Sequence, residues 1–330
     1  MKAMLFLGGM LFLVGPLQAQ DPTSPEPTAT EFGAALDRAI QGTTRKQSFD
    51  LHYKFSEGDV HRWEVEHVET LKTSMNEFSE VVSSRTQSHS HWRIVSVDSQ
   101  GQATLVQTIP WIKWWQRTGE RDPLEFDTRR EGEPPQQFAN EAKKVNVPFP
   151  AISVQRQGKL TKSQEKADHY DFGAGSFWIP LPDQPVSLGH TWSVPNELFA
   201  RSDDNSYKRI KTQMEYRLAA VQGSVAKIDF TTQSLTPIDS PKVHSQICQQ
   251  LTSGHVEFDM NTGKILSKKV NWNEKVIGFH GDNSLTHYLG EYTIRSLDGE
   301  SPPANERVAQ PVIAKPLQIR TAHEPPVFRR

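Results

Sequence analysis

Cysteine is almost absent from this chain of 330 residues, in which Cys248 is the only one. One cysteine cannot form an intramolecular disulfide, so a stable domain must bury enough hydrophobic core or pair with another chain. A lone cysteine is more often a small buried hydrophobic side chain than a reactive thiol. The sequence therefore excludes a disulfide-stabilised scaffold.

No charge of one sign dominates the sequence. Lysine and arginine together number 37, aspartate and glutamate number 39, and the net charge is −2. A chain so close to neutral has no broad electrostatic field for nucleic acid or for an anionic membrane. We therefore expect no nucleic-acid partner.

Long hydrophobic runs are missing after the N-terminus. A short apolar run at residues 5–14 follows Lys2 and is itself followed by Gly15, Pro16 and the small residue Ala19. This order is typical of a cleavable signal peptide, and the run is shorter than the roughly 20 residues that cross a bilayer. A short uncleaved anchor is the alternative. We predict a signal peptide at residues 1–19 and a mature protein in the periplasm, the cell envelope or the medium, with no integral membrane span.

Composition divides the remaining chain into segments. Residues 20–48 combine a spacer rich in Pro, Thr and Ser with one short helix at residues 30–40, and residues 299–330 are rich in proline without any periodicity. Such proline-rich ends are typical of disorder. Between them we expect a first β lobe at residues 49–180 and a second at residues 181–298.

Most of the central region has the period-two alternation of half-buried antiparallel strands. On the first such strand, His61, Trp63, Val65 and His67 alternate with mainly charged residues. The same alternation recurs at residues 214–218, 226–230, 256–260 and 288–295. We predict a mainly β fold of antiparallel curved sheets or partial barrels, with two related lobes and a few short helices.

Glycines mark the expected hairpin turns, and one segment interrupts the strands. The turns lie at residues 98–101, 155–158 and 261–263, each ending in a glycine that tolerates positive φ. Residues 134–144 have the composition of a short helix.

The order of features repeats in the two halves. In each half a glycine precedes a tryptophan, and a strand–turn–strand unit and a Gly-Lys turn follow. The matched pairs are Gly58 and Gly189, Trp63 and Trp192, Trp92 and Tyr216, and Gly158 and Gly263. Chance is the alternative, because any β-meander has glycine turns at such spacing. We predict an internal duplication with extra sequence in the first copy, chiefly at residues 111–147.

Four segments carry a family resemblance: residues 53–59, 97–104, 181–192 and 259–265. Through them the chain resembles an uncharacterised family of exported β-rich bacterial proteins common in planctomycetes, a domain of unknown function. These segments are turn and core positions, so the resemblance implies fold and export and no activity. His190 departs from the pattern, because an acidic residue is expected there.

Sequence motifs for catalysis are missing. The chain has no HExxH, CxxC, EF-hand or GxSxG motif. Residues 173–176 resemble a nucleophile elbow, but Trp178 stands where the second glycine is required. We assign no catalytic, cofactor-binding or metal-binding residue and expect no cofactor.

Histidine pairs are the nearest approach to a metal site. His61 and His67 share one strand face, and His89 and His91 share another. No third ligand stands at a recognisable spacing. We therefore interpret these histidines as exposed polar strand positions.

Tryptophans are the remaining candidates for a contact site. Trp111 and Trp115 lie on one face of a predicted strand and Trp114 on the other. An exposed tryptophan cluster binds sugars, lipids or a protein partner, whereas a buried one fills a core. The favoured function is a non-enzymatic binding protein of the periplasm or envelope, for an apolar ligand or an envelope component. A structural or protein-interaction module of the envelope and an unrecognised hydrolase are the alternatives.

Overall fold

The strands predicted from alternating residues are present in the computed structural model, which describes residues 47–160, 177–204 and 206–299. These residues form a mainly β structure of antiparallel sheets with short helices, and no closed barrel is formed within them. The expected helix at residues 30–40, the spacer and the C-terminal tail lie outside the described residues. No helix in the described part of the chain is long and apolar enough to cross a membrane.

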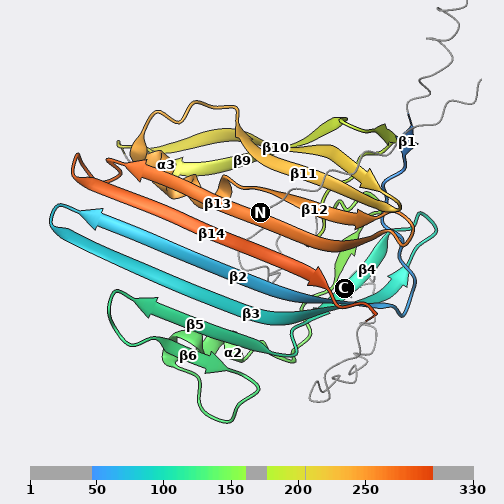
Figure 1. Ribbon diagram of the computed structural model, residues 1–330, viewed down its shortest axis with the longest axis horizontal. Coiled ribbons are helices and arrows are strands. Elements are labelled where there is room, and N and C mark those ends of the chain that lie inside the picture. Colours follow the sequence, from blue (N-terminus) through green and yellow to red (C-terminus); the bar gives the residue numbers. More distant parts are fainter. Residues whose placement is uncertain (1–46, 161–176, 205, 300–330) are drawn as a thin grey trace, which may run out of the picture. The chain divides into compact units, whose positions relative to one another are not determined.

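Strands from both halves of the chain form one twelve-stranded sheet (Figure 1). In sheet order, ten of them are β6 (Leu124–Asp127), β5 (Ile112–Thr118), β3 (Phe78–Val97), β2 (Val60–Met75), β14 (Ser284–Ser296), β13 (Lys264–Ile277), β12 (Ser253–Asp259), β11 (Val225–Ser234), β10 (Tyr207–Gln222) and β9 (Thr191–Arg201). The other two are β4 (Ala103–Thr108), which pairs with β3, and β7 (Ile152–Val154), which pairs with β4. Because β14 pairs with β2, the two predicted lobes are joined in a single continuous sheet. A separate small sheet pairs β1 (Ser48–Phe49) with β8 (Val186–Ser187).

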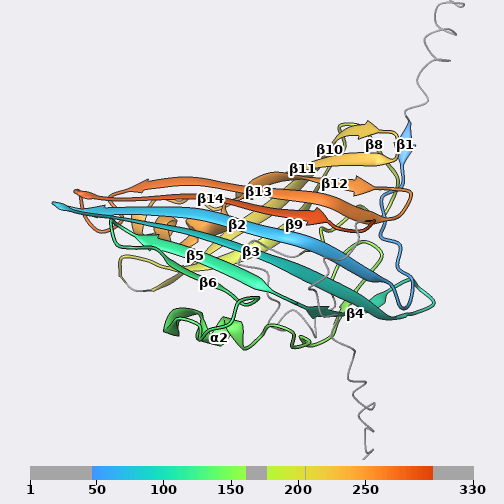
Figure 2. The same ribbon diagram turned by 60° about the horizontal axis from the view of Figure 1, so that its bottom comes forward.

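The long strand β3 branches the sheet. Residues 82–88 of β3 pair with β5, whereas residues 91–97 of the same strand pair with β4. The sequence between β4 and β7 forms β5, β6, the short 3₁₀ helix η1 (Gln136–Phe138) and helix α2 (Ala139–Ala142), which confirms the helix predicted at residues 134–144. Figure 2 shows α2 packed beneath β5 and β6.

One face of the sheet, called here the inner face, covers the main hydrophobic core. Tyr53 and Trp178 come from segments outside the strands and fill this core. The Tyr53 ring lies 5.4 Å from Phe258 on β12 and 5.2 Å from Trp178, and the Trp178 ring lies 6.0 Å from Trp92 on β3. Strands from opposite flanks of the sheet therefore pack on the same aromatic residues, so the sheet curves around them.

Equivalent hydrogen bonds occur in the two hairpins that the sequence matched. The Gly58 amide donates to the Ile94 carbonyl at 2.9 Å, and the Gly189 amide donates to the Leu218 carbonyl at 2.8 Å. The strand pairing then shifts register directly after Ile94 in one hairpin and directly after Leu218 in the other. Both glycines have positive φ, 87° and 80°, which a residue with a Cβ rarely adopts. The orders β2–β3–β4–β7 and β9–β10–β11–β12 are thus alike in topology and in local bonding.

The tryptophans that the sequence paired are not at equivalent positions. Trp192 lies opposite Tyr216, and the residue opposite Trp92 is His61. Trp192 therefore corresponds to His61, and Trp63 lies two residues further along its strand. Trp63 is 2% exposed, whereas Trp192 is half-buried against the same core. The predicted match was wrong because it used only the order in which a tryptophan follows each glycine. Which strand positions are equivalent is decided by the register of the paired strands.

Candidate functional site

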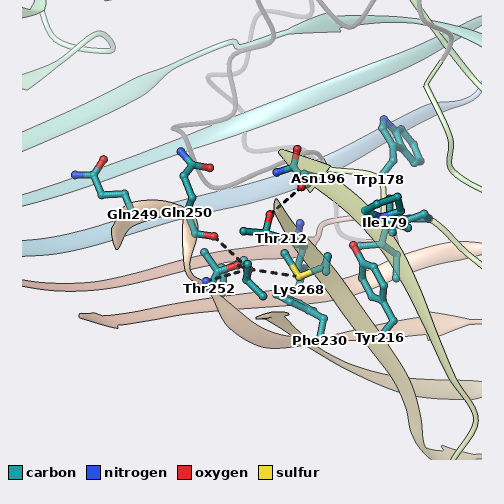
Figure 3. Close-up of a pocket in the computed structure, with 16 residues that line it drawn as sticks. Trp178, Ile179, Asn196, Thr212, Tyr216, Phe230, Gln249, Gln250, Thr252 and Lys268 are labelled. Atoms are coloured by element: carbon teal, nitrogen blue, oxygen red, sulfur yellow. Dashed lines mark hydrogen bonds between the residues drawn. The ribbon is translucent and has the colours of Figure 1, made fainter. Parts of the chain in front are cut away.

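A cavity of about 340 Å³ opens on the inner face of the sheet (Figure 3). Met214 and Tyr216 on β10, Phe230 on β11 and Val270 on β13 form its sheet wall. These side chains share a face because alternate strand residues point to the same side of a sheet. The sheet therefore presents an aromatic and aliphatic wall to the cavity.

Two segments outside the strands also contribute to the lining. They are residues 178–180, and residues 249–252 at the end of helix α3 (Pro241–Ile247) and the 3₁₀ helix η3 (Cys248–Gln250). The Trp192 indole Nε1 donates to the Pro180 carbonyl at 2.9 Å, and the Trp272 Nε1 donates to the Gln249 carbonyl at 2.7 Å. These bonds fix both segments to the sheet, so the cavity is a built feature of the fold.

Gly254 on β12 makes room for the aromatic wall. A Cβ at this position would lie 2.7 Å from Phe230 Cζ and 1.9 Å from the Lys269 carbonyl oxygen. Because Gly254 has no side chain, the Phe230 ring can lie directly over β12. The glycine is thus required by close packing, and not by an unusual φ.

The three threonine hydroxyls of the lining, on Thr212, Thr232 and Thr252, are hydrogen-bonded within the protein. Thr212 Oγ1 donates to the Asn196 carbonyl at 3.3 Å, and Thr232 Oγ1 donates to the Gln250 carbonyl at 3.2 Å. Burial raises the pKa of Tyr216 above its ordinary value, so the phenol stays protonated at neutral pH. The arrangement suits a ligand whose body is apolar, because these bonded groups do not require partners from the ligand.

Lys268 is the only charged residue among the described residues that line the cavity. It lies on β13 and is 6% exposed, and its Nζ lies 5.8 Å from the centre of the Phe230 ring. Figure 3 shows its side chain rising from β13 into the cavity.

Trp114, one of the three candidate tryptophans, belongs to a core. It is 6% exposed and stacks on Phe138 at 5.2 Å and on Phe126 at 6.1 Å between ring centres. Together with Ile109 and Ile112 these residues form a second hydrophobic cluster under β5 and β6. The indole of Trp114 therefore stabilises the packing of β5 and β6 on η1 and α2.

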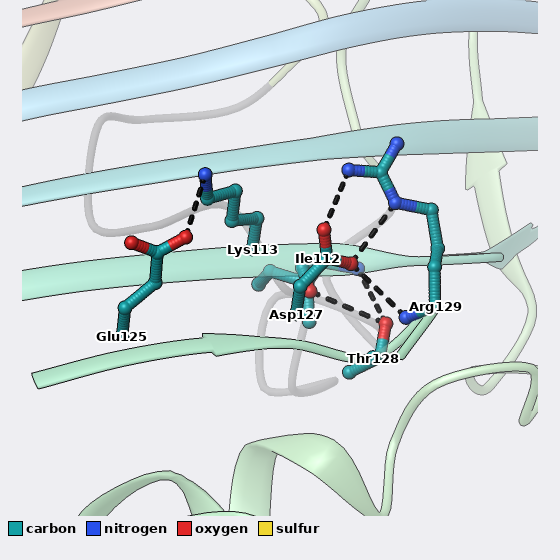
Figure 4. Close-up of polar contacts among 6 residues, drawn as sticks. All are labelled: Ile112, Lys113, Glu125, Asp127, Thr128 and Arg129. Carbon is teal, nitrogen blue, oxygen red and sulfur yellow. Dashed lines mark hydrogen bonds and ion pairs between the residues drawn. The ribbon is translucent and has the colours of Figure 1, made fainter. Parts of the chain in front are cut away.

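Trp111 is partly exposed and is held between two other side chains. Its ring centre lies 4.7 Å from that of His89, and the Arg129 guanidinium lies 4.0 Å from the Trp111 ring centre. The buried Asp127 carboxylate accepts two bonds from Arg129, at 2.9 and 2.7 Å (Figure 4). These bonds from Arg129 lower the pKa of Asp127. The stack fixes Trp111 against the sheet.

Trp115 lies on the opposite face of β5 from Trp114. It is partly exposed beside a shallow groove of about 330 Å³ that also contacts Arg85 and Lys113. Lys113 is paired with Glu125 at 2.8 Å (Figure 4). The structure thus separates the three tryptophans, and none of them lines the cavity on the inner face.

The interpretation of the histidines as exposed strand positions is wrong for three of them. His61, His67 and His89 are buried. His61 and His67 lie on the inner face of β2, and Trp111 covers His89 on the other side of β3. In the described part of the chain, no group of three or more His, Cys, Asp or Glu side chains is placed to hold a metal ion.

Cys248 is a free thiol, and it is buried, as the sequence predicted. Burial raises its pKa above the ordinary value, and its Sγ donates to the Ser245 carbonyl at 3.4 Å. A buried, protonated thiol is a poor nucleophile. The elbow-like residues 173–176 lie outside the described residues.

Comparisons with known proteins gave only distant structural likenesses. No protein-family model matches the chain, and no curated protein matches it. A structure titled "Lipid-protein interactions in lipovitellin" aligns at 10% identity and a TM-score of 0.42, over 74% of this chain and 25% of that one. This chain thus spans about a quarter of the length of that protein.

Two other solved structures align over most of their own length. DynF, from the dynemicin biosynthesis pathway of Micromonospora chersina, has 5% identity and a TM-score of 0.19, over 85% of this chain and 92% of that one. The translocator domain of the autotransporter NalP from Neisseria meningitidis has 5% identity and a TM-score of 0.25, over 81% and 95%. TM-scores at this level do not establish a shared fold or function.

Proposed function

We propose that this chain is an exported, non-enzymatic binding protein that holds an apolar or amphipathic small molecule in the cavity on the inner face of its sheet. The cavity itself carries the proposal. Its volume of about 340 Å³ falls within the range of roughly 300–1,000 Å³ that is typical of small-molecule sites. Such sites are mostly apolar, with a few placed polar groups, and this lining has that composition.

The driving force for binding is the removal of apolar surface from water. Each Å² of apolar surface buried contributes about 25 cal/mol before the costs of association are subtracted. Met214, Tyr216 and Phe230 present such surface to the cavity, and Val194 extends it on β9. A ligand that covers this wall gains affinity without having to satisfy the bonded Thr212 and Thr232 hydroxyls.

The proposal also includes export of the protein, its membership of a family and an internal duplication. Residues 1–19 have the order of a signal peptide, so protein from the native host is expected to begin near Gln20. N-terminal sequencing of that protein tests this, and an intact Met1 would contradict it. The equivalent bonds of Gly58 and Gly189 support a duplication, and we retain membership of the exported β-protein family as a proposal.

A cavity-filling substitution tests the proposed function. We expect the uncharged dye N-phenyl-1-naphthylamine to bind wild-type protein at one site, with enhanced fluorescence. Met214→Trp places a larger side chain in the cavity and should abolish that binding while the fold remains. Lys211→Trp is the matched control, because Lys211 is exposed on the same strand and outside the cavity. Equal dye binding by all three proteins would refute the proposal.

A further inference from the structure

The cavity on the inner face is apolar at one end and polar at the other. Strand register places Tyr216 and Phe230 in one row across β10 and β11, and Asn196 and Thr212 in another row across β9 and β10. Because Thr212 is four residues from Tyr216 on β10, the two rows lie about 13 Å apart along the strand. Figure 3 shows the same separation, with Tyr216 and Phe230 on one side of the cavity and Asn196 and Gln250 on the other. A ligand that spans the cavity therefore meets an aromatic surface and a polar surface.

Side-chain carboxamides at the polar end form no hydrogen bond within the described part of the chain. They belong to Asn196 and Gln250, which are both exposed, and the neighbouring Gln249 adds a third. The backbone of the first two residues is fixed, because the Thr212 hydroxyl donates to the Asn196 carbonyl and the Thr232 hydroxyl donates to the Gln250 carbonyl. The structure thus holds these carboxamides beside the cavity with their donors and acceptors available to a ligand.

The other polar groups near this end are already engaged. The hydroxyls of Thr212, Thr232 and Thr252 are hydrogen-bonded within the protein, and Lys268 interacts within the chain. No carboxylate is present among the described residues that line the cavity. Recognition of a head group therefore depends on the carboxamides, each of which offers N–H donors and a carbonyl acceptor. A hydroxyl or an amide matches both kinds of group, whereas a carboxylate or an ammonium matches only one.

We propose that the ligand is an amphiphile with an uncharged head group that bears hydroxyls or an amide. The head group binds Asn196 and Gln250, and the apolar body covers Tyr216 and Phe230. This inference rests on the proposed function and names the ligand class. The apolar body supplies the driving force, and the hydrogen bonds select the head group, because a polar group that leaves water without a new partner costs affinity. Single-chain acylglycerols combine an apolar chain with uncharged hydroxyls in this way.

A comparison of two ligands with the same acyl chain tests the inference. The head group of 1-decanoylglycerol carries free hydroxyls, and that of methyl decanoate has none. We would measure both affinities by displacement of N-phenyl-1-naphthylamine and take the ratio of the first to the second. One net hydrogen bond corresponds to roughly a fivefold change in affinity, so this ratio should fall by at least that factor in the double variant Asn196→Leu/Gln250→Leu. The variant should still bind the dye and methyl decanoate, because the aromatic row is unchanged.

Asn271→Leu/Gln222→Leu is the matched control, because it removes the same pair of carboxamides from positions outside the cavity lining. It should keep the wild-type ratio. An unchanged ratio in Asn196→Leu/Gln250→Leu would overturn the inference about the head group while the proposed function stands. Tighter binding of decanoate than of 1-decanoylglycerol by wild-type protein would do the same, because the preferred head group would then be an anion. If neither the dye nor any of these molecules binds, the proposed function fails, and this inference fails with it.

Discussion

His61 provides a pH-dependent test of how the core is built. Its side chain lies on the inner face of β2 and is 1% exposed, with its ring centre 5.7 Å from that of Trp63. Both ring nitrogens are buried, and neither has a hydrogen-bond partner in the described structure. Burial lowers the pKa of His61 from 6.5 to about 4, and the nearby Lys264 adds to this shift, whereas Asp298 and Asp59 oppose it.

The sign of the effect follows from the depressed pKa of the folded state. Above about pH 6.5, His61 is neutral in both states, and its contribution to stability is fully present. As the pH falls toward 4, the unfolded chain takes up a proton that the folded chain does not, so the free energy of unfolding decreases. The difference between 6.5 and about 4 corresponds to a loss of about 3 kcal/mol across this window.

Substitution by phenylalanine isolates this contribution. His61→Phe keeps an aromatic ring beside Trp63 and removes the titration. Between about pH 7 and pH 4, the free energy of unfolding of this variant should therefore fall by about 3 kcal/mol less than that of wild type. Urea unfolding at a series of pH values measures both proteins. His190→Phe is the control, because this residue is exposed and its ring is in water in both states. If His61→Phe and wild type lose the same free energy, the residue is not buried as a neutral ring.

Two further pairs of substitutions test the packing. Trp114→Ala should lower the free energy of unfolding by about 3–5 kcal/mol, because its side chain is buried in a stack. Trp115→Ala should lower it by less than about 1 kcal/mol, because Trp115 is partly exposed. Urea unfolding measures both variants, and equal losses of stability would contradict the assignment of the faces. Gly158→Ala should lower the melting temperature more than Gly58→Ala. Both glycines have positive φ, but only at residue 158 would an added Cβ meet a carbonyl oxygen, that of Ile179, at 2.1 Å.

Local sequence patterns predicted the parts of the fold that depend on local geometry. Alternation identified the inner face of β2 at Trp63 and Val65, because a strand has a period of two. Glycine marked the turns at Gly101, Gly158 and Gly263, all of which have positive φ. These features are set by the backbone of a few adjacent residues.

The pairing of distant segments had no local signal. β14 pairs with β2 across more than two hundred residues of sequence, and this pairing joins the two halves in one sheet. The helix α3 was also missed, although Ser240 caps it and Pro241 begins it. The cavity depends on where α3 and residues 178–180 lie over the sheet, so alternation alone did not identify it.

One signal for the site was present in the sequence and was not used. Lys268 has the same strand parity as Val270 and Trp272, so a charged residue stands on an apolar face. The number of tryptophans is high in this part of the sequence, but composition does not show which indole is covered. In the structure, Phe138 covers Trp114, and Arg129 stacks on Trp111.

The central claim is that the cavity on the inner face holds a small molecule. Native mass spectrometry of the protein isolated from its own host tests this most directly. The expected result is one bound apolar or amphipathic molecule per chain, which is lost in Met214→Trp and kept in Lys211→Trp. A wild-type protein that carries no such molecule, or a molecule that Met214→Trp retains equally, would contradict the claim.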